Sequence, residues 1–276
     1  MAYDNYSCIK CRFQDGVLFA AIDNPPINLM TLELSSELYR IAGEIAADDD
    51  VKVVVFESAD PEFFIAHFDV EVLALMGEQQ PPVSMELHDL NKTCEIFRCM
   101  PKVSMAKLEG RARGGGSEFV LGLDMRFAAI GRAMLGQPEV AIGIIPGGGG
   151  TQRLPRLIGQ SRALEVVLGC GDLDAETAER YGYVNRALPA EDIGAFVENL
   201  AFRMASFPAE SIALAKKSVR NAAAMPIVDG LFEETALFAR SLALPEARAR
   251  MKRFLEVGGQ TKKGELFIAD MYEKLS

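Results

Sequence analysis

The feature that most constrains the fold of this chain is the alternation of apolar runs and helix-patterned segments along its first hundred residues. Residues 17–22 form a short apolar run that stops at the turn sequence Asp23-Asn-Pro-Pro26. Thr31 can cap the next segment, in which apolar residues recur at helical spacing up to the aspartate cluster at 48–50. Residues 51–56 are apolar except for one lysine, as in a strand buried on both faces. This order predicts an α/β fold.

The last third of the chain has a different pattern, which predicts helices only. Its helix-patterned segments are separated by prolines and cover residues 190–206, 209–224, 227–243 and 246–258. We therefore expect a division near Ser206, between a core of residues 1–206 and a helical region of residues 207–276.

The charge balance and the apolar pattern argue against two classes of partner. The net charge of −10 disfavours nucleic acid and anionic membranes, since both require a basic face. No apolar run approaches the roughly 20 residues that span a bilayer. The N-terminal residues resemble neither a signal peptide nor a transit peptide, so a cytoplasmic location is expected.

The five cysteines predict free thiols rather than disulfides or a metal site. Cys8 and Cys11 form a C-x-x-C pair, but no second pair of metal ligands follows, and the only histidines are His67 and His88. A zinc site normally has four ligands. The segment around the two cysteines also has the pattern of a strand, which would direct their thiols to opposite faces. We expect no metal.

Two glutamates beside glycine-rich stretches are the strongest indication of chemistry. Glu118 ends the stretch Gly110-Arg-Ala-Arg-Gly-Gly-Gly-Ser-Glu118, and Glu139 lies in Gly136-Gln-Pro-Glu139, upstream of a second glycine run at 147–150. A carboxylate beside bare backbone N–H groups suits reactions that move a proton while negative charge builds on an oxygen. Neither glycine run supplies the lysine of a P-loop, and no G-x-G-x-x-G follows the first strand, which disfavours a nucleotide site.

The two glycine runs differ in what they predict. Gly114 to Gly116 join a strand to a helix-compatible segment, so they would let another group approach the backbone closely at a helix N-terminus, where N–H groups are unpaired. Glu118 would then lie in the first turn of that helix. For Gly147 to Gly150, a tight turn with no other role remains an alternative.

Several spaced motifs, taken in order, resemble the crotonase (enoyl-CoA hydratase/isomerase) superfamily over most of the chain. Any one of these motifs alone would be weak, but their agreement in order is specific. They are Asp23-Asn-Pro-Pro-Ile-Asn28, Phe64-Ile-Ala-His-Phe-Asp69, Gly110 to Glu118 with Asp124-Met-Arg126, Gly136 to Glu139 with Pro146 to Leu154, and Gly171 to Asn185.

The resemblance implies an α/β spiral of strand–strand–helix units with a helical C-terminal region that serves oligomerisation and the coenzyme A site. It also implies a homotrimer or a dimer of trimers, and an acyl thioester of coenzyme A as substrate with no separate cofactor. The family's oxyanion hole carries over to the backbone N–H groups of Phe68 and Gly115. Its two catalytic glutamates carry over to Glu118 and Glu139, and its water-positioning N–H carries over to Gly147.

These residues imply hydration of a 2-enoyl-CoA by syn addition of water. One glutamate takes a proton from water, the other gives one to C2, and the oxyanion hole stabilises the enolate-like charge. The alternatives are another reaction of the same superfamily, namely double-bond isomerisation or thioester hydrolysis, and a non-catalytic acyl-CoA-binding protein.

Some residues depart from the family pattern. His67 stands where the family usually has glycine, and Phe68 where it has a small residue. We expect His67 to be tolerated at a positive φ angle, with substrate contact as the alternative. Arg111 and Arg113 replace small or apolar residues, and they either form surface salt bridges or bind an anionic group. The further candidates for substrate or coenzyme A contact are Ala66, His67, Asp69, Arg113 and Lys262.

Overall fold

The computed structural model describes residues 3–79, 85–272 and 274–275. The chain forms two compact units, residues 1–202 and residues 203–276. The change from one unit to the other occurs within helix α8 (Ile193–Ala205).

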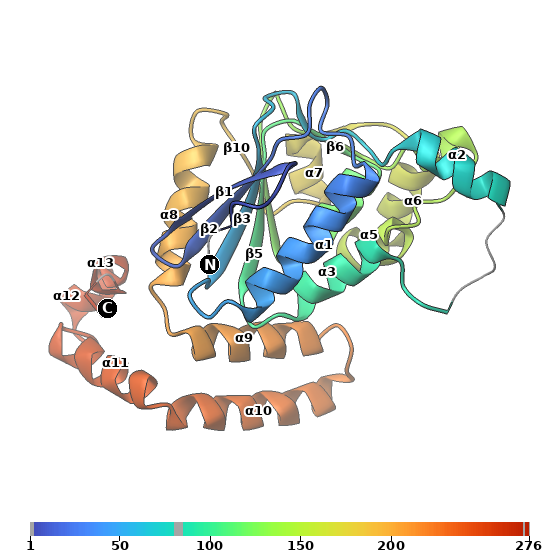
Figure 1. Ribbon diagram of the computed structural model, residues 1–276. Helices are drawn as coiled ribbons and strands as arrows, with labels where there is room; N and C mark the ends of the chain where they lie inside the picture. The colour runs from blue at the N-terminus through green and yellow to red at the C-terminus, as the bar shows by residue number, and fades with distance from the viewer. Residues whose placement is uncertain (1–2, 80–84, 273, 276) are drawn as a thin grey trace. The chain divides into compact units, whose positions relative to one another are not determined.

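The first unit contains two sheets, one of six strands in the order β1-β2-β3-β5-β7-β10 and one of four in the order β4-β6-β8-β9 (Figure 1). All pairings are parallel except β1 with β2 and β8 with β9. The strands are β1 (Ile9–Gln14), β2 (Val17–Ile22), β3 (Val53–Ser58), β4 (Phe63–Ile65), β5 (Val103–Leu108), β6 (Arg111–Arg113), β7 (Met125–Ala129), β8 (Met134–Gly136), β9 (Leu173–Asp174) and β10 (Arg186–Leu188).

Consecutive strands divide regularly between the two sheets. In the pairs β3–β4, β5–β6 and β7–β8, the first strand joins the large sheet and the second joins the small one, and helices follow each pair. This repetition confirms the predicted spiral of strand–strand–helix units. The helices of the unit are α1 (Leu32–Ala47), α2 (Val70–Gln79), α3 (Asp89–Cys99), α4 (Gly115–Leu121), α5 (Gly150–Ile158), α6 (Gln160–Gly169), α7 (Ala175–Tyr181) and α8, with a 3-10 helix η1 (Glu139–Ile142).

Helix α1 begins and ends where its sequence predicts. The side chain of Thr31 accepts a hydrogen bond from the N–H of Leu34, and Asp48 is the C-cap. Buried apolar residues recur on one side of the helix, including Leu34, Leu38 and Ile41. The apolar spacing therefore fixes which side of α1 packs on the sheet.

Three phenylalanines tie the elements near the glycine-rich segment together. The rings of Phe56 on β3, Phe97 on α3 and Phe119 on α4 are fully buried and pack edge to face, with centroids 5.0–6.0 Å apart. Each such pair contributes about 0.5–1.5 kcal/mol beyond the burial of its area. Because Phe119 follows Glu118 directly, this cluster holds the start of α4 in a fixed position.

Helices α3 and α4 lie on one face of the large sheet, and α8 covers the other face (Figure 1). Phe19 on β2 contacts Phe202, and Phe127 on β7 contacts Phe196, with ring centroids 5.9 and 5.3 Å apart. The sheet is therefore buried on both faces in its central strands, as the apolar run at 51–56 predicts.

The second unit is helical, as its sequence predicts. Leu214 and Leu237 are its most buried leucines, and Lys217 forms an ion pair with Glu233 at 2.7 Å. Its helices are α9 (Ala209–Asn221), α10 (Ile227–Ala243), α11 (Pro245–Glu256), α12 (Lys262–Leu266) and α13 (Ile268–Tyr272). Within the described ranges, no helix is both long enough and apolar enough to cross a membrane.

Candidate active site

The first glycine run lies where strand β6 leads into helix α4. Gly114 has a φ of +49°, a backbone angle that favours glycine. A Cβ on Gly116 would lie 2.5 Å from the carbonyl oxygen of Ile65, and a Cβ on Gly115 would lie 3.4 Å from the backbone nitrogen of Phe68. The close approach expected at these glycines is thus made by the chain's own segment 65–68.

The segment 66–69 is held in place by Met30. The N–H of Met30 donates to the carbonyl of His67 at 2.9 Å, and the N–H of Asp69 donates to the carbonyl of Met30 at 3.1 Å. Since backbone groups of an extended segment point alternately to its two sides, the N–H of Phe68 points away from Met30. Neither this N–H nor that of Gly115 donates to another residue in the described part of the chain. Two free donors are therefore adjacent at this place.

Glu118 lies in the first turn of α4 and is only 4% exposed. Its Oε1 accepts a hydrogen bond from the N–H of Gly150 at 2.8 Å. A Cβ on Gly148 would lie 2.5 Å from its Oε2. Burial raises the pKa of Glu118, while hydrogen bonds from the Gly150 and Gly148 N–H groups lower it. The second glycine run thus surrounds the Glu118 carboxylate and does more than form a tight turn.

Glu139 opens the short helix η1 and is 8% exposed. Its Oε2 is buried and has no hydrogen-bond partner among the described residues. Burial raises the pKa of Glu139 to about 7, a hydrogen bond from its own backbone N–H opposes this shift, and the charge of Glu118 adds to it. Near neutral pH both the protonated and the ionised form of this carboxyl group are therefore populated.

Gly114 is the point where the two glutamates and the segment around Phe68 meet. Its carbonyl accepts a hydrogen bond from the N–H of Glu118 at 2.8 Å. A Cβ on Gly114 would lie 2.9 Å from Oε1 of Glu139 and 3.5 Å from Cβ of His67. The structure therefore brings together Glu118, Glu139, Phe68, Gly115 and the glycine run that includes Gly147; their roles in a reaction stay predictions.

The expectation for the backbone of His67 is wrong. Its φ is not positive; among the described residues, the non-glycine positions with positive φ are Asp15, Asn28, Cys170 and Gln260. His67 belongs to the extended segment beside Met30, and its Nδ1 lies 2.9 Å from the carbonyl oxygen of Phe68. Because a carbonyl can only accept, Nδ1 carries the proton in this contact. The histidine thus bonds to the residue whose N–H faces Gly115.

Three of the other candidate contacts, Ala66, Asp69 and Arg113, are buried or have partners within the first unit, and the fourth belongs to the second unit. Ala66 is 2% exposed, and the Asp69 carboxylate accepts a hydrogen bond from the N–H of Glu71 at the start of α2. Arg113 forms two hydrogen bonds to the Asp172 carboxylate, at 2.7 and 2.5 Å, which raise the pKa of Arg113. Lys262 opens helix α12 in the second unit. Their roles toward a substrate remain predictions.

Three residues near Glu118 have no role at the site that the sequence predicts. His88, Asn91 and Arg153 contact the backbone of the second glycine run. Arg153 follows that run by three residues, so its place in the sequence could have indicated a contact with the run. His88 and Asn91 lie 59 and 56 residues from Gly147 in sequence, and nothing local indicates their contact with it.

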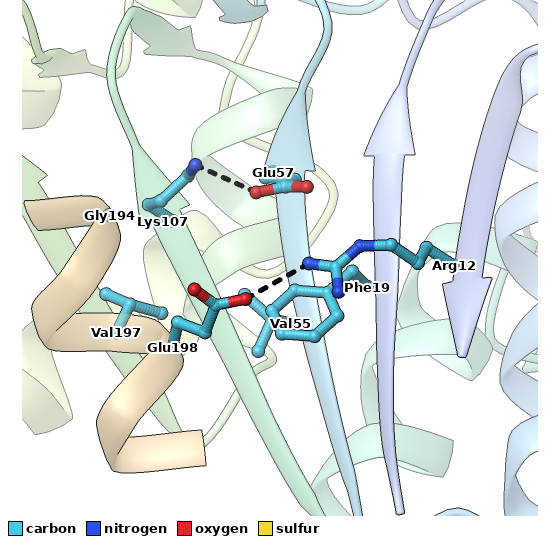
Figure 2. Close-up of a pocket in the computed structure, with 8 residues that line it drawn as sticks. All are labelled: Arg12, Phe19, Val55, Glu57, Lys107, Gly194, Val197 and Glu198. Atoms are coloured by element: carbon cyan, nitrogen blue, oxygen red, sulfur yellow. Dashed lines mark hydrogen bonds and ion pairs between the residues drawn. The ribbon is translucent and has the colours of Figure 1, made fainter. Parts of the chain in front are cut away.

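A separate cavity lies on the other face of the large sheet, between the sheet and helix α8 (Figure 2). Its charged rim is paired, since Arg12 contacts Glu198 at 3.3 Å and Lys107 contacts Glu57 at 2.8 Å. Its volume of about 120 Å³ is small beside the roughly 300–1,000 Å³ of ligand pockets. The lining residues are Arg12, Phe19, Val55, Glu57, Lys107, Gly194, Val197 and Glu198.

The cavity and the two glutamates lie on different faces of the large sheet. Phe19 alternates along β2 with Leu18 and Ala20, which lie in the core that contains Phe119. The glutamates are therefore the candidate site of chemistry. Within the described ranges, no group of three or more His, Cys, Asp or Glu side chains is placed to hold a metal.

The spiral of strand–strand–helix units, with glycines that place two free N–H groups beside buried glutamates, defines a protein of the crotonase class. The family description enoyl-CoA hydratase/isomerase matches residues 12–263, and the chain belongs to this family.

Curated relatives and a solved structure agree with this membership. The chain is 30% identical to "Probable enoyl-CoA hydratase, mitochondrial" of Dictyostelium discoideum, over 83% of this chain and 81% of that protein. It is 28% identical to the short-chain-enoyl-CoA hydratase of Clostridium acetobutylicum, over 87% of this chain and 91% of that protein. The crystal structure of enoyl-CoA hydratase from Bacillus anthracis is 29% identical, covers 91% of this chain and 96% of its own, and superimposes with a TM-score of 0.84.

Proposed function

We propose that this protein adds water to the C2–C3 double bond of a 2-enoyl-CoA thioester. The observation that carries the proposal is the different state of the two glutamates. Burial raises the pKa of both carboxyl groups, that of Glu139 to about 7. Glu118 accepts hydrogen bonds from the N–H groups of Gly150 and Gly148, which favour its carboxylate, whereas Oε2 of Glu139 has no partner among the described residues. A base and an acid thus stand side by side near neutral pH.

The proposed reaction starts with the thioester oxygen between the N–H groups of Phe68 and Gly115. The Glu118 carboxylate takes a proton from a water molecule that the N–H of Gly147 positions, and the hydroxide oxygen bonds to C3. The electron pair of the double bond moves toward the thioester oxygen, where the two N–H groups stabilise the charge. Glu139 then gives its proton to C2, which yields a 3-hydroxyacyl-CoA.

General magnitudes indicate how much each of these groups would contribute to the rate. Proton transfer by a positioned side chain contributes typically 10²–10⁴-fold to the rate. Removal of one oxyanion donor typically costs about 10²–10³-fold. Both donors proposed here are backbone groups, so the bulk of the Phe68 side chain leaves the donor itself intact.

We further propose that residues 1–206 form the catalytic core and that residues 207–276 serve oligomerisation and the coenzyme A site, with Lys262 near a phosphate. Helix α10 supports an association role, because it exposes Ile227, Phe232 and Phe238 by 76%, 72% and 62%. A homotrimer or a dimer of trimers is the proposed assembly. Sedimentation measurements test it, and a monomer at micromolar concentration would contradict it.

Incubation with crotonyl-CoA followed by mass analysis of the product tests the reaction. Hydration predicts loss of the enoyl absorbance and a product heavier by one water. An unchanged product mass with a moved double bond would indicate isomerisation instead. Release of free coenzyme A would indicate hydrolysis, and binding without turnover over a panel of acyl chains would indicate a non-catalytic protein.

A further inference from the structure

Helix α3 carries a polar row on the side that meets the second glycine run. His88 is its N-cap, and Asn91 and Glu95 follow at spacings of three and four residues, so the three lie on one side of the helix. Leu90, Cys94 and Phe97 are buried. The row is therefore placed on a helix whose orientation is fixed by packing.

Two side chains of this row donate to one carbonyl group. Nε2 of His88 lies 2.7 Å from the carbonyl oxygen of Gly147, and Nδ2 of Asn91 donates to the same oxygen at 3.2 Å. Nε2 of His88 also lies 3.0 Å from Nδ2 of Asn91, but its contact with the carbonyl oxygen is the shorter one. Because this oxygen can only accept, Nε2 carries a proton, and Nδ2 of Asn91 bonds to the oxygen rather than to the ring. The carbonyl of Gly147 is thus held by two donors from one helix.

Arg153 completes the cluster and sets the orientation of Asn91. Its Nη1 donates to Oδ1 of Asn91 at 2.9 Å and to the carbonyl of Gly148 at 3.0 Å, and its Nη2 pairs with Glu95 at 3.1 Å. The bond to Oδ1 leaves Nδ2 of Asn91 to face Gly147. The guanidinium also occupies the space that a Cβ on Gly149 would need.

We propose that His88, Asn91 and Arg153 are positioning residues that hold the loop 147–150 against Glu118. This proposal rests on the proposed function, in which Glu118 and Gly147 activate water. Four successive glycines have the largest backbone freedom of any sequence, so the loop needs partners outside itself to keep one conformation. These three residues, called the clamp below, hold the carbonyls of Gly147 and Gly148 on the outer side of the loop. On the inner side, the N–H groups of Gly148 and Gly150 bond to Glu118.

The double variant His88→Ala/Asn91→Ala tests the clamp on the folded, full-length protein. It removes both donors to Gly147, and we expect kcat to fall about tenfold or more while KM changes less than about threefold. Each single variant should lower kcat by less than half of that amount on a logarithmic scale, because the remaining donor still holds the shared carbonyl. His88→Gln keeps an N–H donor of similar reach and should retain most of the activity. Lys92→Ala, on the same helix but outside the cluster, is the matched control and should leave kcat unchanged.

The pH profile of the Arg153→Gln variant tests an electrostatic effect that a purely structural role of Arg153 would not produce. The positive charge of Arg153 lowers the pKa of Glu118, so its removal should shift the acid limb of the pH profile of kcat/KM to higher pH. The other titratable groups that face Glu118 remain in this variant; they are His88, Cys94, Glu139 and Tyr183. An unshifted acid limb would contradict a direct influence of Arg153 on Glu118.

Hydrogen–deuterium exchange separates this inference from the proposed reaction, since it needs no turnover. The double variant should exchange the amides of residues 147–153 faster than the wild type, with unchanged exchange in β3 and β5. If the wild type does not hydrate enoyl-CoA but exchange accelerates, the reaction is wrong and the clamp stands. If the wild type hydrates and the double variant keeps wild-type kcat and exchange, the clamp is wrong.

Discussion

The backbone N–H of Gly150 donates to Oε1 of Glu118 at 2.8 Å, although the two residues are 32 positions apart in sequence. The bond joins the N-terminus of helix α5 to the first turn of helix α4. It makes the second glycine run part of the carboxylate's environment. Any change in that loop should therefore alter the chemistry more than the stability of the fold.

Gly148→Ala tests this dependence. A methyl group there would lie 2.5 Å from Oε2 of Glu118 and from Cδ2 of Leu90, so the carboxylate must move. We expect kcat to fall by about 10²-fold or more, with an unchanged circular dichroism spectrum. Gly43→Ala is the control, since its methyl group meets open space within helix α1 and should leave kcat as it is. Wild-type activity in Gly148→Ala would contradict the tight fit around Glu118.

The pH profile of kcat/KM should fall as the pH rises through about 7. Burial raises the pKa of Glu139 to about 7, and the reaction needs its protonated form to deliver a proton to C2. The two glutamates influence each other, so the limb belongs to the pair rather than to one residue. Initial rates at low substrate concentration from pH 5 to 9 measure it. A profile that stays flat to pH 9 would exclude Glu139 as the acid in this range.

Glu139→Gln should stabilise the protein relative to the wild type more at pH 8 than at pH 5. The pKa of Glu139 is raised in the folded state, so the fold binds this proton more tightly than the unfolded chain does. Its contribution to stability is complete below the ordinary pKa of 4.5 and is lost as the pH rises to about 7. The difference amounts to at most about 3 kcal/mol.

Thermal midpoints at the two pH values measure this effect of Glu139→Gln. The exposed Glu234→Gln is the control, and its difference from the wild type should not depend on pH in this way. An equal difference at pH 5 and pH 8 for Glu139→Gln would show that the ionised carboxylate costs nothing in the fold.

Asn28→Ala should lower the free energy of unfolding by about 1–3 kcal/mol. The buried Asn28 amide donates to Ser58 Oγ at 2.9 Å and to the carbonyl of Phe63 at 3.1 Å, and its Oδ1 accepts from the N–H of Asn24 at 2.7 Å. Its φ of +49° also disfavours alanine. Asn28→Gly relieves the backbone term, so urea unfolding should place it between Asn28→Ala and the wild type. An Asn28→Gly variant more stable than the wild type would mean that the hydrogen bonds of the Asn28 side chain do not stabilise the fold.

Local patterns in the sequence predict local structure well in this chain. Thr31 as a cap and the placement of Glu118 in a first helical turn each depend on neighbouring residues, and the structure contains both. The strand predicted at 51–56 is also present, although it begins and ends two residues later, as β3 (Val53–Ser58). The series of motifs also identifies the family. These features could be predicted because spacing and capping act over a few residues.

The contacts that shape the site are nonlocal and could not be predicted in the same way. The partner of Gly116 is Ile65, and the partners of Gly147 are His88 and Asn91. Parallel pairing and helix packing bring these segments together across dozens of residues, so their own sequences carry no sign of it. For His67, side-chain statistics favoured a positive φ, but the bonds of its segment to Met30 impose an extended backbone.

The central claim is that Glu118 and Glu139 act as the base and the acid of a hydration reaction. The most direct test compares loss of crotonyl-CoA absorbance by the wild type, Glu118→Gln, Glu139→Gln and the double variant, each confirmed as folded. We predict rapid hydration by the wild type and a loss of at least about 10²-fold in each single variant, with the double variant little worse than either. Wild-type rates in the double variant would contradict the claim.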